Sequence, residues 1–147
     1  MKFRLIIDKT KDEEVVVTAH APSELTDKIA ALVTENTGSN TIPAYTEDDL
    51  VLLPFSKIAC ITVLDGKTYA IDEKGDQYRL KLRLYELEQI VPTGFIRINK
   101  STLANEAHLE RFTATYSGGI NAVFKSGYED YVSRRCFANI KRRFESR

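Results

Sequence analysis

Cysteine and histidine are scarce in this chain, and their scarcity argues against two common kinds of site. Two cysteines, Cys60 and Cys136, are too few and too far apart for a disulfide framework. The two histidines, His20 and His108, show no spacing typical of a metal motif. We therefore expect free thiols and no bound metal. One alternative concerns Cys136, because the two arginines before it favour a thiolate and would suit a redox sensor.

Long apolar runs are also missing. No stretch approaches the roughly 20 residues that a membrane-spanning helix needs. The N-terminus carries charges too early, and too short an apolar core, for a signal peptide. An apolar fraction of 43% is normal for a globular protein and argues against disorder. A length of 147 residues fits one domain, or one domain with a small appendage. We expect a cytoplasmic protein.

The motifs of catalysis are missing as well. The chain has no Walker loop, no dinucleotide fingerprint and no nucleophile elbow. The acidic triplet at residues 47–49 has no second carboxylate cluster to pair with, so it is typical of a solvated turn. An enzyme needs a positioned nucleophile, an acid/base pair or metal ligands. We therefore predict no enzyme, no small-molecule substrate and no cofactor.

Charge is balanced overall but unevenly distributed. The chain has a net charge of zero, whereas residues 1–50 carry −5 and residues 51–147 carry +5. Such asymmetry between segments is typical of a protein with one half that faces nucleic acid. The acidic segment would repel phosphates, so we expect it to face away from them or to meet a different partner.

The first 50 residues predict a small β-β-α-β segment. Strands are expected over residues 2–8 and 13–20, and a third over residues 41–46. Between them, Ser23 is a good N-cap for a helix that ends at Gly38. The spacing of its apolar residues predicts one buried face, formed by Leu25, Ile29, Leu32 and Val33.

The remainder predicts short strands and tight turns, as in a sandwich-like β domain. Residues 57–64 and 67–72 flank an Asp-Gly turn and form a hairpin. A strand over residues 78–84 and a short helix over residues 85–91 follow. The later predicted strands are 109–116, 120–125 and 128–132. A final helix, capped by Ser133, has one apolar stripe formed by Cys136, Phe137, Ile140 and Phe144.

The strand over residues 78–84 has a basic outer face formed by Arg79, Lys81 and Arg83. Side chains two apart on a strand stand roughly 7 Å from each other, close to the separation of successive phosphates. A polar outer face is equally typical of any half-buried strand. Phosphate contact and simple solvation therefore both stay open.

Two donor-rich segments indicate the ligand. Residues 95–105 read FIRINKSTLAN, a strand-like alternation that runs into several strong donors. Residues 132–135 read VSRR, although cations at a helix start oppose the helix dipole. Lysine can donate to guanine, asparagine can pair with adenine, and serine suits a phosphate. Two such loops on a β-rich scaffold point to a long anionic ligand, and nucleic acid fits best.

Residues 95–105 and 131–135, taken together, resemble the LytTR DNA-binding domain of bacterial transcription regulators. The segments 55–61 and 83–88 fit the same pattern, and the resemblance covers roughly residues 52–147. The whole chain resembles stand-alone members that have a short N-terminal segment in place of a receiver domain.

The resemblance implies a mainly β (α+β) fold, an elongated multi-sheet domain with a C-terminal helix. We expect this domain over residues 51–147, after the β-β-α-β segment of residues 1–50. In the family, loops rather than a recognition helix enter successive major grooves. The base-reading positions match Lys67, Lys100 and Arg135. The other DNA-binding positions match Asn99, Ser101, Lys125, Ser133 and Arg134.

The resemblance also implies a function. It predicts a sequence-specific transcription regulator that binds double-stranded promoter repeats, as a homodimer at least on DNA. Stand-alone members are often encoded beside a small membrane protein that restrains them, so residues 1–50 are expected to dimerise or to receive such a signal. Two rival functions stay open. One is a protein-interaction module whose DNA contact is secondary, and the other is a redox sensor that acts through Cys136.

Overall fold

The computed structural model describes residues 1–11, 14–37 and 40–146. The chain forms two compact units, residues 1–39 and residues 40–147, and each is described by itself. The division lies upstream of the predicted boundary at residue 50, because residues 41–54 form a hairpin that belongs to the second unit.

Helix α1 (Glu24–Thr37) is the regular element described in the first unit. The Ser23 hydroxyl accepts a hydrogen bond from the Thr26 amide (3.3 Å), as expected of an N-cap. The predicted end of the helix at Gly38 lies outside the described residues. Leu25 and Leu32 are exposed, so the predicted burial of this face is wrong for them.

The two strands predicted before α1 are wrong. Residues 1–11 and 14–23 contain no strand, and Glu13 lies outside the described residues. Apolar side chains in these segments, such as Phe3 (91% exposed) and Val16 (75% exposed), lie in solvent. Two strands without a further surface to pack on are marginal in water. Their apolar residues, including the consecutive valines 15–17, therefore did not by themselves determine a strand.

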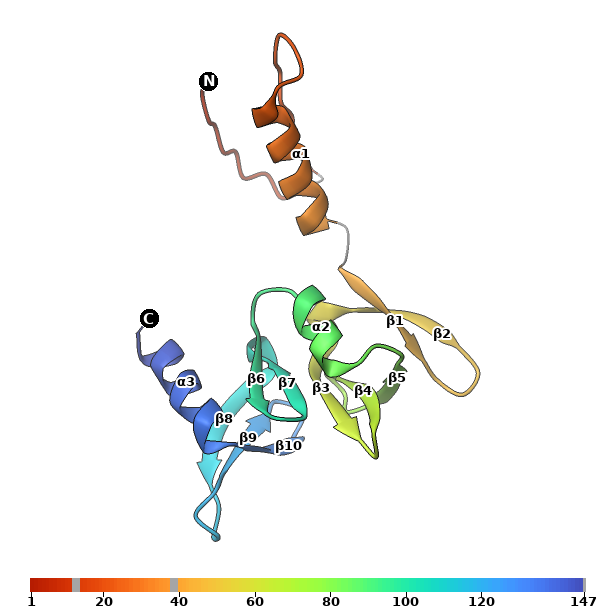
Figure 1. Cartoon of the computed structure of the whole chain (residues 1–147), viewed down its shortest axis with the longest axis vertical. Coiled ribbons are helices and arrows are strands. Elements are labelled where there is room, and N and C mark those ends of the chain that lie inside the picture. The colour runs from red at the N-terminus through yellow and green to blue at the C-terminus, as the bar shows by residue number, and fades with distance from the viewer. Residues whose placement is uncertain (12–13, 38–39, 147) are drawn as a thin grey trace. The chain divides into compact units, whose positions relative to one another are not determined.

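The second unit contains a seven-stranded antiparallel sheet in the order β2-β1-β5-β4-β3-β7-β6 (Figure 1). Helix α2 (Leu84–Ile90) follows β5 and buries Leu84 and Leu87. The strands are β1 (Thr41–Tyr45), β2 (Leu50–Pro54), β3 (Ile58–Leu64), β4 (Lys67–Asp72), β5 (Gln77–Leu80), β6 (Phe95–Asn99) and β7 (Thr102–Asn105).

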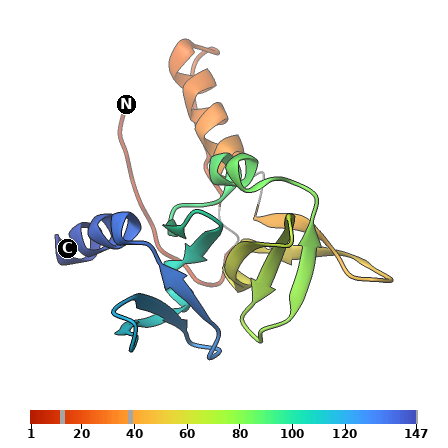
Figure 2. The same cartoon turned by 60° about the horizontal axis from the view of Figure 1, so that its bottom comes forward.

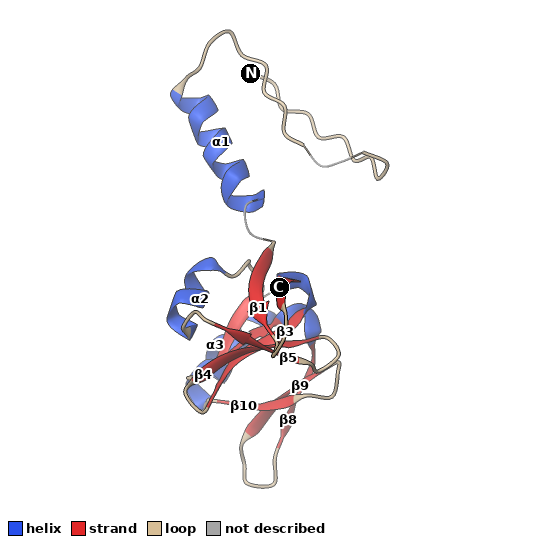
Figure 3. Ribbon diagram, turned by 90° about the vertical axis from the view of Figure 1, so that its right-hand side faces the viewer, coloured by secondary structure: helices blue, strands red, loops and turns tan. Residues whose placement is uncertain are grey.

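A second, three-stranded sheet has the order β10-β9-β8 and leads into helix α3 (Figure 2). Its strands are β8 (Leu109–Ala114), β9 (Ile120–Phe124) and β10 (Glu129–Val132), and α3 spans Arg134–Glu145. The Ser133 hydroxyl accepts from the Cys136 amide (3.2 Å) and caps α3, as predicted. Figure 3 shows that strands dominate the second unit, which is the predicted mainly β class.

Most predicted strands of the second unit are confirmed, one is shorter than predicted, and two observed strands, β2 and β7, were not predicted. The expected strand over residues 78–84 ends at Leu80, because Arg83 is the N-cap of α2 and its N–H donates to the Glu86 carboxylate (3.2 Å). Strand β2 was not predicted, since LVLLP lacks a clear alternation and contains a proline. It forms because β1 supplies a full set of antiparallel partners.

A buried polar chain joins the two sheets. Thr102 is fully buried on β7, and its hydroxyl donates to the Asp130 carboxylate of β10 (2.6 Å). Thr62 of β3 lies 2.8 Å from the same hydroxyl. Because Thr102 has only one hydroxyl proton and gives it to Asp130, Thr62 must donate to Thr102. This chain fixes β10, and therefore the start of α3, relative to the loop between β6 and β7.

Candidate nucleic-acid interface

The hairpin turn between β3 and β4 presents Lys67. Asp65 and Gly66 form the turn with positive φ values of 51° and 76°, a conformation that Asp-Gly sequences adopt readily. Leu64 and Lys67 form the last pair of the hairpin. The Lys67 side chain is exposed at the end of the sheet.

The loop between β6 and β7 presents Lys100, whereas Asn99 lies inside the protein. Asn99 is completely buried. Its amide donates to the Tyr131 carbonyl of β10 (2.8 Å), and its side-chain oxygen accepts from the Ser101 N–H (2.8 Å). In this arrangement the Asn99 side chain has no access to a base edge. It shapes the loop and ties it to the second sheet.

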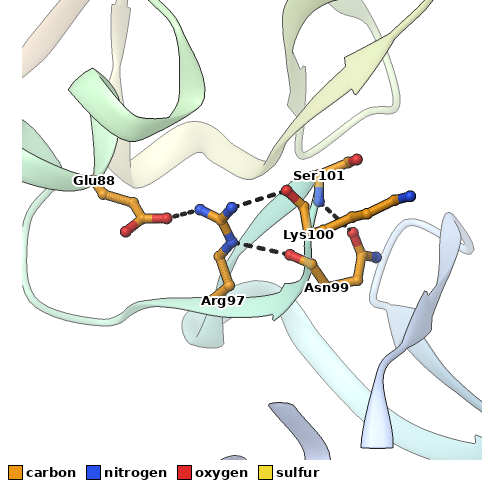
Figure 4. Close-up of polar contacts among 5 residues, drawn as sticks. All are labelled: Glu88, Arg97, Asn99, Lys100 and Ser101. Carbon is orange, nitrogen blue, oxygen red and sulfur yellow. Dashed lines mark hydrogen bonds and ion pairs between the residues drawn. The ribbon is translucent and has the colours of Figure 1, made fainter. Parts of the chain in front are cut away.

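Arg97 and Glu88 hold the same loop from the other side (Figure 4). The Arg97 guanidinium donates to the carbonyls of Asn99 (3.0 Å) and Lys100 (2.8 Å). Its remaining nitrogen pairs with the Glu88 carboxylate of α2. The Lys100 side chain points away from Arg97 (Figure 4). No pattern in the sequence indicates this pairing, because Glu88 and Arg97 belong to different elements that only the fold brings together.

The junction between β10 and α3 presents two arginines. Arg134 and Arg135 are exposed on the first turn of α3, directly after the capping Ser133. Arg135 also borders a hollow of about 430 Å³ between β6 and α3, together with Arg97 and Arg143. The N-terminus of a helix already carries partial positive charge, so two cations there are unfavourable unless an anion binds.

Backbone hydrogen bonds bring these three loops to one end of the seven-stranded sheet (Figure 1). The Val63 N–H, close to the last pair of β3 with Lys67, donates to the Ser101 carbonyl (3.0 Å). On the other side of this loop, the Ser133 N–H donates to the Ile98 carbonyl (2.9 Å). Strands lie about 4.8 Å apart, so the Lys67 turn and the β6–β7 loop are separated by about 10 Å. The three loops form one continuous edge, here called the loop edge.

Lys125 does not lie close to the loop edge. Its N–H donates to the His108 carbonyl (2.9 Å), and the His108 ring contacts the Ser56 carbonyl (2.6 Å), just before β3 begins. Lys67 lies beyond the opposite end of β3, a strand of seven residues that is roughly 20 Å long. The main chain at Lys125 is therefore remote from the three loops.

The basic residues 79, 81 and 83 do not form a continuous face of one strand. The Arg79 guanidinium lies over the Tyr69 ring, 5.9 Å from its centroid, and donates to a backbone carbonyl. The Lys81 ammonium lies 4.4 Å from the centroid of the Tyr45 ring. These contacts give Arg79 and Lys81 intramolecular roles and leave phosphate contact by this face without support.

The two cysteines are free and differ in environment. Cys60 is fully buried, and burial raises its pKa, with the nearby Asp130 carboxylate adding to the shift. Burial likewise raises the pKa of Tyr128 to about 12, with the Asp130 carboxylate adding to the shift. Cys60 therefore remains a protonated core thiol. Cys136 is half-buried on α3.

The described residues form neither a metal-binding cluster nor a membrane-spanning helix. No group of three or more His, Cys, Asp or Glu side chains gathers there as a metal site would require. None of the helices described is both long enough and apolar enough to cross a bilayer.

Comparisons with known proteins identify the family. The family model described as the LytTr DNA-binding domain matches residues 48–145. The chain is 32% identical over 146 residues to an uncharacterized HTH-type transcriptional regulator of Staphylococcus aureus (strain MSSA476), with 97% of each chain covered. A second uncharacterized HTH-type transcriptional regulator of Staphylococcus aureus, from strain COL, is 31% identical with the same coverage.

A solved structure matches the fold. A LytTr DNA-binding domain from Bacillus cereus has a TM-score of 0.65 and 24% identity, covering 71% of this chain and 96% of that domain. Although the relatives are described as HTH-type, the three helices that the structure describes here are separated by strands, so no two of them form a helix-turn-helix unit.

The family match covers well over half of the chain and includes all three loops of the loop edge. It is a match to a DNA-binding domain family and not to an enzyme class. The chain belongs to the LytTR DNA-binding domain family.

Proposed function

We propose that this protein regulates transcription by binding duplex DNA sequence-specifically through the loop edge. The observation that carries the proposal is the convergence of three loops from distant parts of the sequence. In the part of the chain that the structure describes, no ion pair holds the side chains of Lys67, Lys100 or Arg135. Their charged groups are therefore available to an anionic ligand.

The loops would enter successive major grooves, with the two lysines and Arg135 at base edges. Lysine and arginine donate to guanine O6 and N7, which is the commonest specific contact to DNA. Ser101, Ser133 and Arg134 surround these residues and are suited to phosphate contacts that fix the register. Asn99 would act through the shape of the loop. The argument for a phosphate contact by Lys125 is that it matches a DNA-binding position of the family, and its place in the fold does not add to that argument.

The first test is a band-shift titration over a salt series. The DNA is the sequence that the protein selects from a random pool. Each phosphate neutralised by Lys or Arg should contribute a slope of about −0.9 to the dependence of log K on log salt. A steep slope with a clear preference for the selected sequence is expected. Binding that is independent of salt, or equal on scrambled DNA, would contradict the proposal.

We further propose that the protein binds repeated half-sites as a homodimer, and that the first unit receives a regulatory signal from a protein partner. A small membrane protein is one candidate partner, as the family resemblance implies. The support for the partner is that apolar side chains, including Phe3, Ile7 and Val16, are exposed in this unit. The same segment is rich in acidic residues. Apolar surface of this kind is more typical of a binding surface than of a solvated one.

Removing residues 1–39 tests this division of roles. Because β1 begins at Thr41 and belongs to the main sheet, a chain that starts at Asn40 retains every strand of the second unit. We expect its affinity for one DNA half-site to change less than threefold, while promoter output in cells changes strongly. Loss of half-site binding with the fold intact by circular dichroism would assign DNA contacts to the first unit instead.

A further inference from the structure

One ion pair and two hydrogen bonds connect helix α2 to the main chain that carries Lys100 (Figure 4). We propose that Glu88 and Arg97 form a clamp that orients Lys100 and thereby helps to set which DNA sequence the protein prefers. The proposal rests on the proposed reading role of Lys100. It adds two positioning residues that would not touch a base themselves.

The clamp fixes the direction of the loop because each of the three guanidinium nitrogens of Arg97 has a partner within the protein. Its Nε and one terminal nitrogen hold the carbonyls of two successive residues, Asn99 and Lys100, while the other terminal nitrogen pairs with Glu88. Only the planar fork of arginine presents donors in this arrangement. Two carbonyls held to one rigid plane define the orientation of the peptide between them, and so the direction in which the Lys100 side chain leaves the chain.

The opposite side of the loop is held independently. The buried Asn99 oxygen accepts from the Ser101 N–H (2.8 Å), and the Ser101 carbonyl accepts from β3. The loop is thus fixed from the α2 side by Arg97 and from the sheet side by Asn99. Lys100 lies between these two supports.

Stability alone does not explain the arrangement. The side chains of Arg97 and Glu88 are each 37% exposed, and ion pairs with such access to water contribute little to the free energy of folding. An exposed pair can nevertheless select one orientation of a loop. The alternative role for Arg97 is a direct phosphate contact, for which its guanidinium still has one N–H on each terminal nitrogen.

Arg97→Lys separates the two roles because it keeps the charge and removes the fork. If Arg97 positions Lys100, the ratio of affinities for selected and scrambled DNA should fall on the order of tenfold, while the salt slope stays as in the wild type. Arg111→Lys is the matched control. It makes the same change at an exposed Arg–Glu pair on β8, and it should leave the ratio unchanged.

Glu88→Gln gives a test in which charge and positioning predict different effects on the preference for the selected DNA sequence. Removing a carboxylate should tighten binding to all DNA if only long-range charge matters. If the clamp operates, affinity for scrambled DNA should rise or stay level, while preference for the selected sequence falls several-fold. Glu86→Gln is the control on the same helix, since glutamine still accepts from the Arg83 N–H and the cap is kept.

A double-mutant cycle with Lys100→Ala completes the experiment. The losses from Arg97→Lys and Lys100→Ala should not add, because both act through one side chain, whereas the losses from Arg97→Lys and Lys67→Ala should add. If Lys100→Ala lowers discrimination while Arg97→Lys and Glu88→Gln do not, the clamp is wrong and the proposed function stands. If Lys100→Ala itself has no effect, the reading role of this loop fails and the clamp fails with it.

Discussion

Replacing Arg135 with alanine should lower the discrimination between selected and scrambled DNA by about 1–3 kcal/mol, the usual value of a bidentate contact with one base. The side chain is exposed on the first turn of α3, and no ion pair within the described residues holds it. Its removal should therefore leave the fold intact. Competition band shifts on both DNA sequences, at one fixed salt concentration, measure the effect.

Arg142→Ala is the matched control for this experiment. It removes the same charge from an exposed position about two turns further along α3, where the guanidinium contacts only Asn139 (3.4 Å) in the part of the chain described. This variant should weaken binding to both DNA sequences by a similar small factor. Equal losses of discrimination in the two variants would mean that Arg135 contributes charge and reads no base.

Local patterns predicted the elements whose partners are close in sequence. The β3–β4 hairpin follows from Asp65-Gly66, because these residues adopt the positive φ values that a tight turn requires. The three-stranded sheet and the cap of α3 at Ser133 likewise depend on neighbours along the chain. These elements form where the sequence alone predicts them.

Elements that depend on distant partners could not be predicted in this way. The segments before α1 are rich in apolar residues but have no described strand, whereas β2 has little alternation and is a strand, because β1 is aligned beside it. Strand formation depends on a partner edge, and a single segment does not contain that information.

In the candidate site, too, positions set by local sequence could be predicted and positions set by distant partners could not. Exposed residues at turns, such as Lys67 and Lys100, are where the sequence predicts them. The structural use of Asn99 depends on Tyr131, which is distant in sequence and belongs to another sheet. A polar residue in a loop could equally face solvent or the core, and only tertiary contacts decide between the two.

Asn99 therefore provides the second large prediction, in which stability rather than base contact is the direct readout. Asn99→Ala leaves the Tyr131 carbonyl and the Ser101 N–H without their partner and opens a small cavity at a fully buried position. We expect a loss of about 2–4 kcal/mol in the free energy of unfolding, from orphaned polar groups plus the cavity. Urea unfolding followed by circular dichroism gives this value.

Asn139→Ala is the control, because that amide is exposed on α3 and its loss should change stability by no more than about 0.5 kcal/mol.

The two roles for Asn99 predict different results. A residue that read adenine directly would lose discrimination on mutation and keep its wild-type stability. A residue that supports the loop would lose stability first, and its effect on discrimination would fall within the loss seen for Lys100→Ala, since both changes act on the same loop. If Asn99→Ala had wild-type stability, Asn99 would again be a candidate for direct contact with a base. The link between the two sheets would then depend on the hydrogen bond between Thr102 and Asp130.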